Sequence, residues 1–215
     1  MTTLLSQLSP SITNLIRLDH TQVLSAFHQY ELGSPPRVKK GLADNVCLAI
    51  EIHAQLEEEL FYPALRAVAD NEILRKSTPE HDEMRGLIAR LRNMPVDNPA
   101  FDDTFFELMR HVMHHVADEE TMLLPEAERA LGAELGELGA RMMRRRLELA
   151  LPRAGELARN GVRALPGSLL AVAGALVVGA FFAGRALTRP SLPRLSAPRL
   201  PRRLAPARLR ARLSG

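Results

Sequence analysis

Cysteine is almost absent from this chain, since Cys47 is the only one among 215 residues. One cysteine cannot form an internal disulfide, and it cannot supply the set of thiolates that holds a zinc or iron–sulfur cluster. We therefore expect the protein to be located in a reducing compartment. The first ten residues place no basic residue before their apolar ones, so we expect no secretory signal.

Acidic residues and histidines are scarce in the last third of the chain. Residues 141–215 carry 16 Arg against two Glu, a net charge of +14, whereas residues 1–140 carry 12 Lys and Arg against 23 Asp and Glu, a net charge of −11. All seven histidines lie at or before His115. We therefore expect the first half to contain the functional site and the second half to determine where in the cell the protein is located.

A pattern that occurs twice contains most of these histidines. Each copy reads His-x-x-x-Glu-Glu, with Pro ten residues after the His: His53, Glu57, Glu58 and Pro63 in one, and His115, Glu119, Glu120 and Pro125 in the other. Each copy is preceded by an acidic residue and a histidine: Asp19-His20 lies 33 residues before His53, and Glu80-His81 lies 34 residues before His115. The chain therefore contains two copies of one helical unit.

The spacing predicts a site for two metal ions. Residues four apart on a helix lie one above the other, so the His and the Glu of each copy can bind the same ion. Two copies related by a pseudo-twofold axis would direct four histidines and two glutamates at one point. The predicted ligands are His20, His53, Glu57, His81, His115 and Glu119.

The types of ligand indicate which metal to expect. The two glutamates, Glu57 and Glu119, are expected to bridge the ions, and each ion is expected to have two of the histidines. Imidazole and carboxylate ligands without any thiolate favour iron, then manganese, over structural zinc.

Periodicity and helix-breaking residues predict four helices in the first half. The first begins at Ser11 and ends before the break at 33–36, and the second covers about residues 38–62, where Pro63 bends or ends it. The third begins at the capping motif of residues 77–80, and the fourth begins at 98–99. Short loops between successive helices predict an all-α, antiparallel up-down four-helix bundle.

These residues resemble the hemerythrin-like cation-binding (HHE) domain. The resemblance depends on the two acid-His pairs, the two His-x-x-x-Glu-Glu motifs, and the Phe-Tyr-Pro and Leu-Pro sequences that follow them, and it covers about residues 11–130. It implies a four-helix bundle with two iron ions joined by an oxo or hydroxo bridge. Relatives use this centre to bind O₂, to sense O₂, iron or NO, to store iron, or to repair iron–sulfur centres.

The chain departs from the oxygen carriers of that family. Those carriers have another His one turn away on the third helix and an Asp as one bridge, whereas this chain has Ser77 and Arg85 at the corresponding positions and two glutamate bridges. This ligand set is more similar to that of the iron-repair and iron-sensing relatives. His111 is either a fifth His ligand, which would leave an open position on one ion, or a residue at the edge of the core. Glu58, Glu120 and Tyr62 are expected beside the ligands.

The second half predicts attachment to a membrane. Residues 131–163 are expected to form a basic amphipathic helix and a linker, with a helix over 126–151 that packs on the bundle or lies on an anionic membrane. The uncharged run 164–184 predicts a transmembrane helix over 164–187, with a buried hairpin or an interfacial helix as the alternative. Small residues recur in it every four positions, which predicts a homo-oligomer.

The tail, residues 188–215, contains eight Arg and no acidic residue, so we expect it to be disordered and to bind anionic lipid. It has no aromatic residues for stacking on bases, which disfavours nucleic acid.

The sequence thus predicts a membrane-anchored protein with a metal-binding domain, residues 1–130, in the cytoplasm. We expect a non-haem di-iron protein that binds or senses O₂, NO or iron. The alternative is an enzyme that acts on O₂ or peroxide as an oxidase or catalase, or a role in iron storage or iron-centre repair. No substrate pocket, reductase or cysteine-bearing repair domain can be recognised in the sequence, and this favours binding over catalysis.

Overall fold

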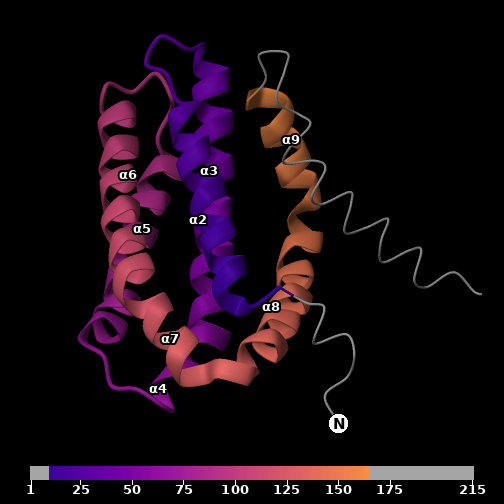
Figure 1. Cartoon of the computed structure of the whole chain (residues 1–215). Coiled ribbons are helices and arrows are strands. Elements are labelled where there is room, and N and C mark those ends of the chain that lie inside the picture. The colour runs from indigo at the N-terminus through magenta and orange to yellow at the C-terminus, as the bar shows by residue number, and fades with distance from the viewer. Residues whose placement is uncertain (1–9, 165–215) are drawn as a thin grey trace, which may run out of the picture. The chain divides into compact units, whose positions relative to one another are not determined.

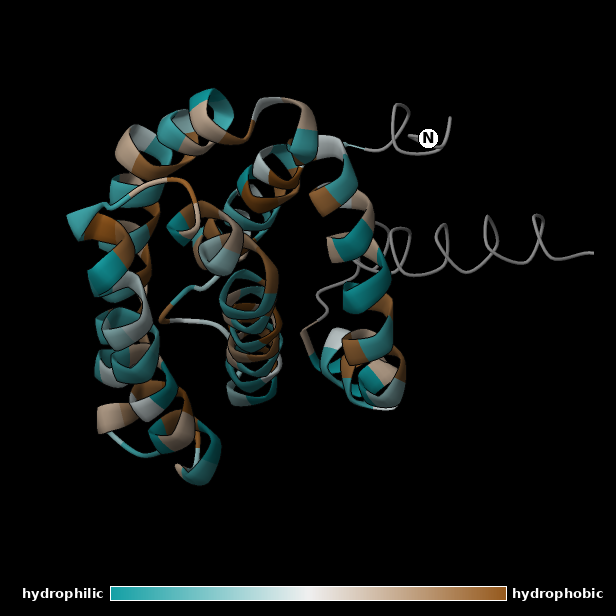
Figure 2. Ribbon diagram, turned by 90° about the horizontal axis from the view of Figure 1, so that it is seen from below, coloured by the Kyte–Doolittle hydropathy of each residue, from teal (hydrophilic) through white to brown (hydrophobic). Residues whose placement is uncertain are grey.

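The computed structural model describes residues 10–164, and within this range the chain forms helices and short connections without any strand. Four helices form the bundle: α2 (Ile12–His28), α3 (Pro36–Leu56), α5 (Glu72–Asn93) and α6 (Ala100–Asp118) (Figure 1). Hydrophilic and hydrophobic segments alternate along them, as expected for helices with one apolar face (Figure 2). The predicted all-α bundle is therefore confirmed.

Two hydrophobic clusters fill the bundle. The upper cluster, in the orientation of Figure 1, includes Val23 and Phe27 of α2, Val38 to Ile50 of α3, Met84 to Leu91 of α5 and Phe101 to Val116 of α6. The lower cluster includes Ile12, Leu15 and Ile16 of α2, Leu56 to Leu65 beyond the middle of α3, Leu74 of α5 and Leu123 to Leu131 after α6. Along the chain the order is lower, upper, upper, lower, and then the same again. Successive helices therefore run in opposite directions, as the short loops predict.

The third helix begins earlier than the sequence predicts. The side chain of Asn71 accepts a hydrogen bond of 2.7 Å from the backbone N–H of Ile73, and the helix starts at Glu72. Pro79 therefore lies inside α5 and not at its first turn. The prediction of a start at residues 77–80 was wrong.

The residues of the apparent capping motif make other contacts. The hydroxyl of Ser77 donates to the carbonyl of Ile73 at 3.0 Å, and the carboxylate of Glu80 accepts a hydrogen bond of 2.8 Å from the ring of His115. A capping box needs both side chains to bond to backbone N–H groups of the first turn. Here both are directed elsewhere, so the motif does not mark a helix start.

A π-helical turn follows both α3 and α6. The turn η1 (Glu57–Phe61) leads into α4 (Tyr62–Arg66), and η2 (Glu119–Leu123) leads into α7 (Leu124–Leu131). In each turn the N–H five residues later donates to the carbonyl of the glutamate. The prolines of the repeat, Pro63 and Pro125, follow one residue later. A proline in a helix clashes with the carbonyl four residues before it, and the wider turn relieves that clash. The helix therefore continues past Pro63 and ends at Arg66.

The helix predicted over 126–151 is divided. Its first part is α7, which ends before Gly132, whose φ of 44° is readily adopted only by glycine. A 3₁₀ turn, η3 (Gly132–Glu134), connects it to α8 (Leu135–Ala150). Pro152 was expected to stop the helix, but it lies in another 3₁₀ turn, η4 (Leu151–Arg153), and the chain continues as α9 (Ala154–Ala164).

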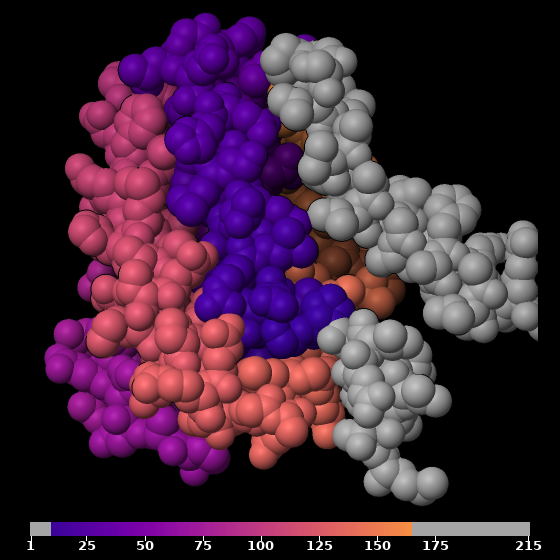
Figure 3. All heavy atoms as spheres, in the orientation of Figure 1, coloured from indigo at the N-terminus to yellow at the C-terminus, as the bar shows by residue number. Residues whose placement is uncertain are grey.

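Helices α8 and α9 pack against the bundle. Leu138 and Met142 of α8 are buried in the lower cluster, and α2 lies between α6 and α8 (Figure 3). The end of α9 approaches α3 so closely that a Cβ added to Gly41 would lie 2.6 Å from the backbone nitrogen of Ala164. Of the two expectations for the basic segment, packing on the bundle is the one that the structure shows.

Within residues 10–164, no helix combines the length and apolar character needed to cross a bilayer. The predicted transmembrane helix over 164–187, its small residues and the tail 188–215 lie outside the described residues, apart from Ala164.

Replacing Gly41 with Ala should lower the free energy of unfolding by about 1–3 kcal/mol, because the new methyl group would meet the backbone of α9. The control is Gly86→Ala, at an exposed position of α5 with no atom within 4 Å of the added Cβ. It should raise the free energy of unfolding by about 0.5–1 kcal/mol. Urea unfolding followed by circular dichroism measures both, and two stabilising substitutions would contradict the close contact of α9 with α3.

Candidate metal centre

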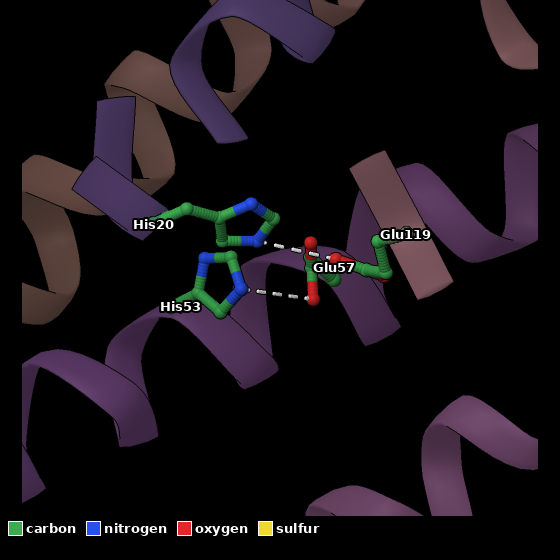
Figure 4. Close-up of side chains that lie close together, drawn as sticks. All are labelled: His20, His53, Glu57 and Glu119. Carbon is green, nitrogen blue, oxygen red and sulfur yellow. Dashed lines mark ion pairs between the residues drawn. The ribbon is translucent and has the colours of Figure 1, made fainter. Parts of the chain in front are cut away.

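The six predicted ligands come together in one buried layer between the upper and lower clusters. They come from all four helices of the bundle and the two π-turns, and none is more than 8% exposed. Figure 4 shows four of them, His20, His53, Glu57 and Glu119, directed at one another. The Nε2 atom of His53 lies 3.2 Å from Glu57 Oε2, and that of His20 lies 3.3 Å from Glu119 Oε2.

The layer contains two groups of side chains that could each hold an ion. In each group the candidate ligand atoms lie within 4.8 Å of one another: His20, His53, Glu57 and Glu119 in the first, and Glu57, His81 and His115 in the second. Glu57 belongs to both groups, as expected for a bridge. Glu119 belongs to the first, and its Oε2 atom also lies 3.6 Å from the Nε2 of His115. Each group contains two histidines, as the sequence predicts.

Four of these atoms fit a metal because they are buried without a hydrogen bond. They are Nε2 of His20, Nε2 of His53, Oε1 of Glu57 and Oε2 of Glu119. A buried polar atom without a partner costs about 1–3 kcal/mol, so four of them in one place indicate a ligand. Imidazole nitrogen and carboxylate oxygen together suit iron or manganese.

In the absence of metal, protons balance the charges of this layer. Burial lowers the pKa of His81 to about 2, and the neighbouring positive charge of His115 adds to this. Burial and the charge of Glu119 both raise the pKa of Glu57. Burial opposes the charging of His115, yet Glu119 and Glu57 raise the pKa of its ring well above its usual value. Burial likewise opposes the ionisation of Glu119, but His115 and His20 lower the pKa of its carboxyl. Cations that bind here must therefore displace protons.

The other ring nitrogen of each histidine contacts a carboxylate. The Nδ1 atoms lie 2.9 Å from Glu120 for His20, 3.3 Å from Asp19 for His53, 2.9 Å from Glu58 for His81, and 2.8 Å from Glu80 for His115. An ionised carboxylate can only accept, so each Nδ1–H donates, and each Nε2 can offer its electron pair to a metal once it carries no proton. All four rings are therefore oriented to bind a metal through Nε2.

These contacts follow the pseudo-twofold relation between the two copies. Asp19 and Glu80, each one residue before a ligand histidine, bond to the second histidine of their own copy. Glu58 and Glu120, each one residue after a ligand glutamate, bond to the first histidine of the other copy. The expectation that Glu58 and Glu120 lie beside the ligands is met. The role of Asp19 and Glu80 as partners of the histidines was not predicted, although the repeated acid-His pair points to it.

Arginines hold two of these four carboxylates, and the local sequence pattern predicts a role in the site for neither arginine. Arg85 donates to both oxygens of Glu58 at 2.7 Å, and Arg146 donates to the two oxygens of Asp19 at 2.8 and 2.5 Å. Arg85 lies on α5, but Arg146 lies on α8, outside the bundle. Nothing in the local sequence distinguishes Arg146 from the basic residues around it.

Tyr62 reaches the centre because of the π-turn. In an α-helix, residues five apart point about 140° away from each other, whereas the i to i+5 bonding of a π-turn brings them close to one face. The Tyr62 hydroxyl lies 3.0 Å from Glu57 Oε2 and 2.8 Å from Glu119 Oε1. The equivalent residue after the second π-turn is Leu124, so Tyr62 makes the two halves of the centre different.

The remaining histidines lie away from the ligand layer. His111 is 36% exposed, and its Nδ1 atom lies 3.3 Å from Glu83. His28 and His114 are exposed. The structure therefore does not bring His111 to the ions as a fifth His ligand.

A small cavity adjoins the ligands on the side of the upper cluster. Its volume is about 20 Å³, and it is lined by the four ligand histidines, Asp19, Val23, Ile50, Met84, Val112 and Val116. This space is enough for about one water-sized molecule. Apart from the four histidines and Asp19, the residues that line it are apolar, so the cavity favours a small, weakly polar molecule.

Replacing Glu57 with Gln should stabilise the metal-free protein at pH 8 by about 1–3 kcal/mol, because one of two neighbouring buried carboxylates loses its charge. Since the pKa of Glu57 is raised in the folded protein, the wild type takes up a proton and becomes more stable as the pH falls toward that pKa. The gain should therefore shrink at lower pH.

Urea unfolding in the presence of a chelator measures this gain, and the variant should also retain less iron. The control, Glu83→Gln at an exposed position, should change stability by less than about 0.5 kcal/mol. A variant that is less stable at pH 8 and binds iron normally would exclude Glu57 as a bridging ligand.

Several known proteins are similar to this chain. A protein of Nostoc sp. named DNA nickase is 27% identical over 127 residues, which are 59% of this chain and 36% of that protein. The uncharacterized protein Rv2633c of Mycobacterium tuberculosis is 30% identical over 107 residues, which are 48% of this chain and 65% of that protein. The chain thus spans about a third and about two thirds of these relatives.

The fold is also that of a solved structure. The crystal structure of a hemerythrin HHE cation-binding domain-containing protein, the Rv2633c homolog of Mycobacterium kansasii, superposes with a TM-score of 0.59 and 22% sequence identity. The match covers 73% of this chain and 99% of that chain. The model of the hemerythrin HHE cation-binding domain matches residues 11–127, which contain all six predicted ligand positions. The chain therefore belongs to the hemerythrin HHE cation-binding domain family.

Proposed function

We propose that this protein binds two iron ions and uses them to bind or sense O₂ or NO. The observation that supports a diatomic ligand is the small cavity, whose apolar walls meet all four ligand histidines. Its volume of about 20 Å³ matches a molecule about the size of water. Iron itself, as a sensed or stored ion, is the other ligand that such a site could serve.

Iron is preferred because of the balance of ligands. Four histidines and two shared glutamates give each ion both nitrogen and oxygen donors, a mixture that suits iron better than structural zinc. A bound ferrous pair would supply the electrons and the open coordination position that O₂ or NO needs.

Side chains of the protein line the cavity and orient the groups around it. Val23, Ile50, Met84 and Val112 give the cavity apolar walls, and the four outer carboxylates hold the imidazole rings in place. The Tyr62 hydroxyl is shared between Glu57 and Glu119, and burial together with these carboxylates raises the pKa of Tyr62 well above its usual value. Tyr62 therefore keeps its proton and remains a hydrogen-bond donor at the centre.

The test is to load the whole chain with iron, reduce it anaerobically and expose it to O₂ or NO. Metal analysis should give two ions per chain. A diatomic-binding protein should show a new absorption spectrum that reverses when the gas is removed. Prompt oxidation with continued consumption of peroxide would instead indicate the enzymatic alternative, and an unchanged spectrum with release of iron would indicate storage.

Substitutions of Val112 test the cavity directly. Val112→Leu adds a methylene group to its wall and should weaken or slow binding of the diatomic by roughly tenfold or more, with the iron content unchanged. Val112→Ala enlarges the cavity and should not impede binding. Stopped-flow absorbance measures both, and identical binding in the two variants would exclude the cavity as the binding place.

We also propose that the protein is anchored to a membrane with its metal domain in the cytoplasm. The support is the uncharged sequence 164–184 and the eight arginines after residue 187. The full chain should float with vesicles that contain anionic lipid, and a chain that ends at residue 163 should not. If the full chain does not float either, the proposal of a membrane anchor is overturned. The name of the Nostoc relative does not lead us to propose nucleic acid as a partner, because this chain matches only 36% of that protein.

A further inference from the structure

Arg146 connects α8 to the ligand layer through two successive contacts. Its guanidinium donates to both carboxylate oxygens of Asp19 at 2.8 and 2.5 Å. Oδ2 of Asp19 in turn lies 3.3 Å from Nδ1 of His53, and Nε2 of that ring lies 3.2 Å from Glu57. The side chains of Arg146 and Asp19 are only 22% and 12% exposed, so the pair is largely shielded from water.

His53 depends on this support more than the other histidines do. Its contact with a carboxylate is 3.3 Å, whereas the other three are 2.8–2.9 Å. Its partner is an aspartate, which is one methylene shorter than the glutamate, Glu80, at the equivalent position of the second copy. A short side chain at a long distance leaves the ring weakly held unless the carboxylate itself is fixed. The bidentate arginine provides that fixation.

We infer that Arg146 is a positioning residue of the metal centre, which fixes Asp19 and thereby the ring of His53. The metal centre of this chain is thus built from five helices, and the fifth, α8, lies beyond residue 127, where the family match ends. The inference requires that the domain binds a metal, but it does not depend on O₂ or NO as the ligand.

The adjacent residue, Arg145, provides a matched control. It also makes two hydrogen bonds to a carboxylate of the bundle, at 2.7 and 3.0 Å, but its partner is Glu59. Glu59 is 36% exposed, accepts from Gln55, and among the described residues has no contact with a ligand histidine. Loss of either arginine therefore removes one ion pair between α8 and the bundle, but only the loss of Arg146 releases Asp19.

The experiment compares Arg146→Gln with Arg145→Gln in the full chain. Titration with cobalt(II), followed by its visible absorption, should show that Arg146→Gln binds the metal 10–100-fold more weakly, as expected when a group that orients a histidine ligand is lost. Arg145→Gln should bind as the wild type does. Thermal unfolding of the metal-free proteins should show similar small losses in both. Arg146→Lys, which keeps the charge without the paired geometry, should recover part of the affinity.

Equal cobalt affinities in the two glutamine variants would overturn the inference. A double-mutant comparison with Asp19→Asn gives a second test. If Arg146 acts through Asp19, the two substitutions together should weaken binding no more than Asp19→Asn alone does. Additive losses would show that Arg146 acts by another route. If Arg146→Gln does not fold, the same comparison is made with Arg146→Lys.

Discussion

The structure depends on one constraint, the burial of six candidate metal ligands in a single layer between two hydrophobic clusters. Glu57 and Glu119 are fully buried and share the hydroxyl of Tyr62. Two carboxylates in such surroundings repel each other and lose their hydration, so protons or metal ions must compensate them. The upper and lower clusters supply the stability that allows this polar layer to exist. The bundle therefore carries a site that is unfavourable in isolation and is completed by cations.

The order of this layer comes from an exchange of contacts between the two halves of the domain. Glu58 and Glu120 follow ligand glutamates of one copy and orient histidines of the other. Each copy therefore orients a histidine of the other copy. Arg85 and Arg146 extend this arrangement outward, and the second of them makes α8 part of the centre. Tyr62 is the main departure from symmetry, because Leu124 occupies the equivalent place.

Much of the site could be predicted from the sequence because its main determinants are local. The His-x-x-x-Glu spacing places two ligands on one helical face whatever surrounds the helix. The repetition of that spacing after an acid-His pair indicated two units directed at one centre, and the structure brings the same six residues together. Helix boundaries were harder to predict. Ser77 and Glu80 have the sequence of a capping box but serve a backbone carbonyl and His115, and Gly132 interrupts a run whose apolar spacing continues.

The sequence by itself determined the six candidate ligands, the all-α bundle and the alternation of helix directions, since these follow from periodicity, loop length and residue chemistry. Only the tertiary structure decided which carboxylate holds which histidine, that His111 faces Glu83, and that Arg146 reaches Asp19 across 127 positions of sequence. The physical reason is that such contacts depend on how the helices are rotated and packed against one another. The residue pattern of a single helix does not predict that packing. In η1, the Tyr62 hydroxyl contacts Glu57 only because the turn is π-helical and not α-helical.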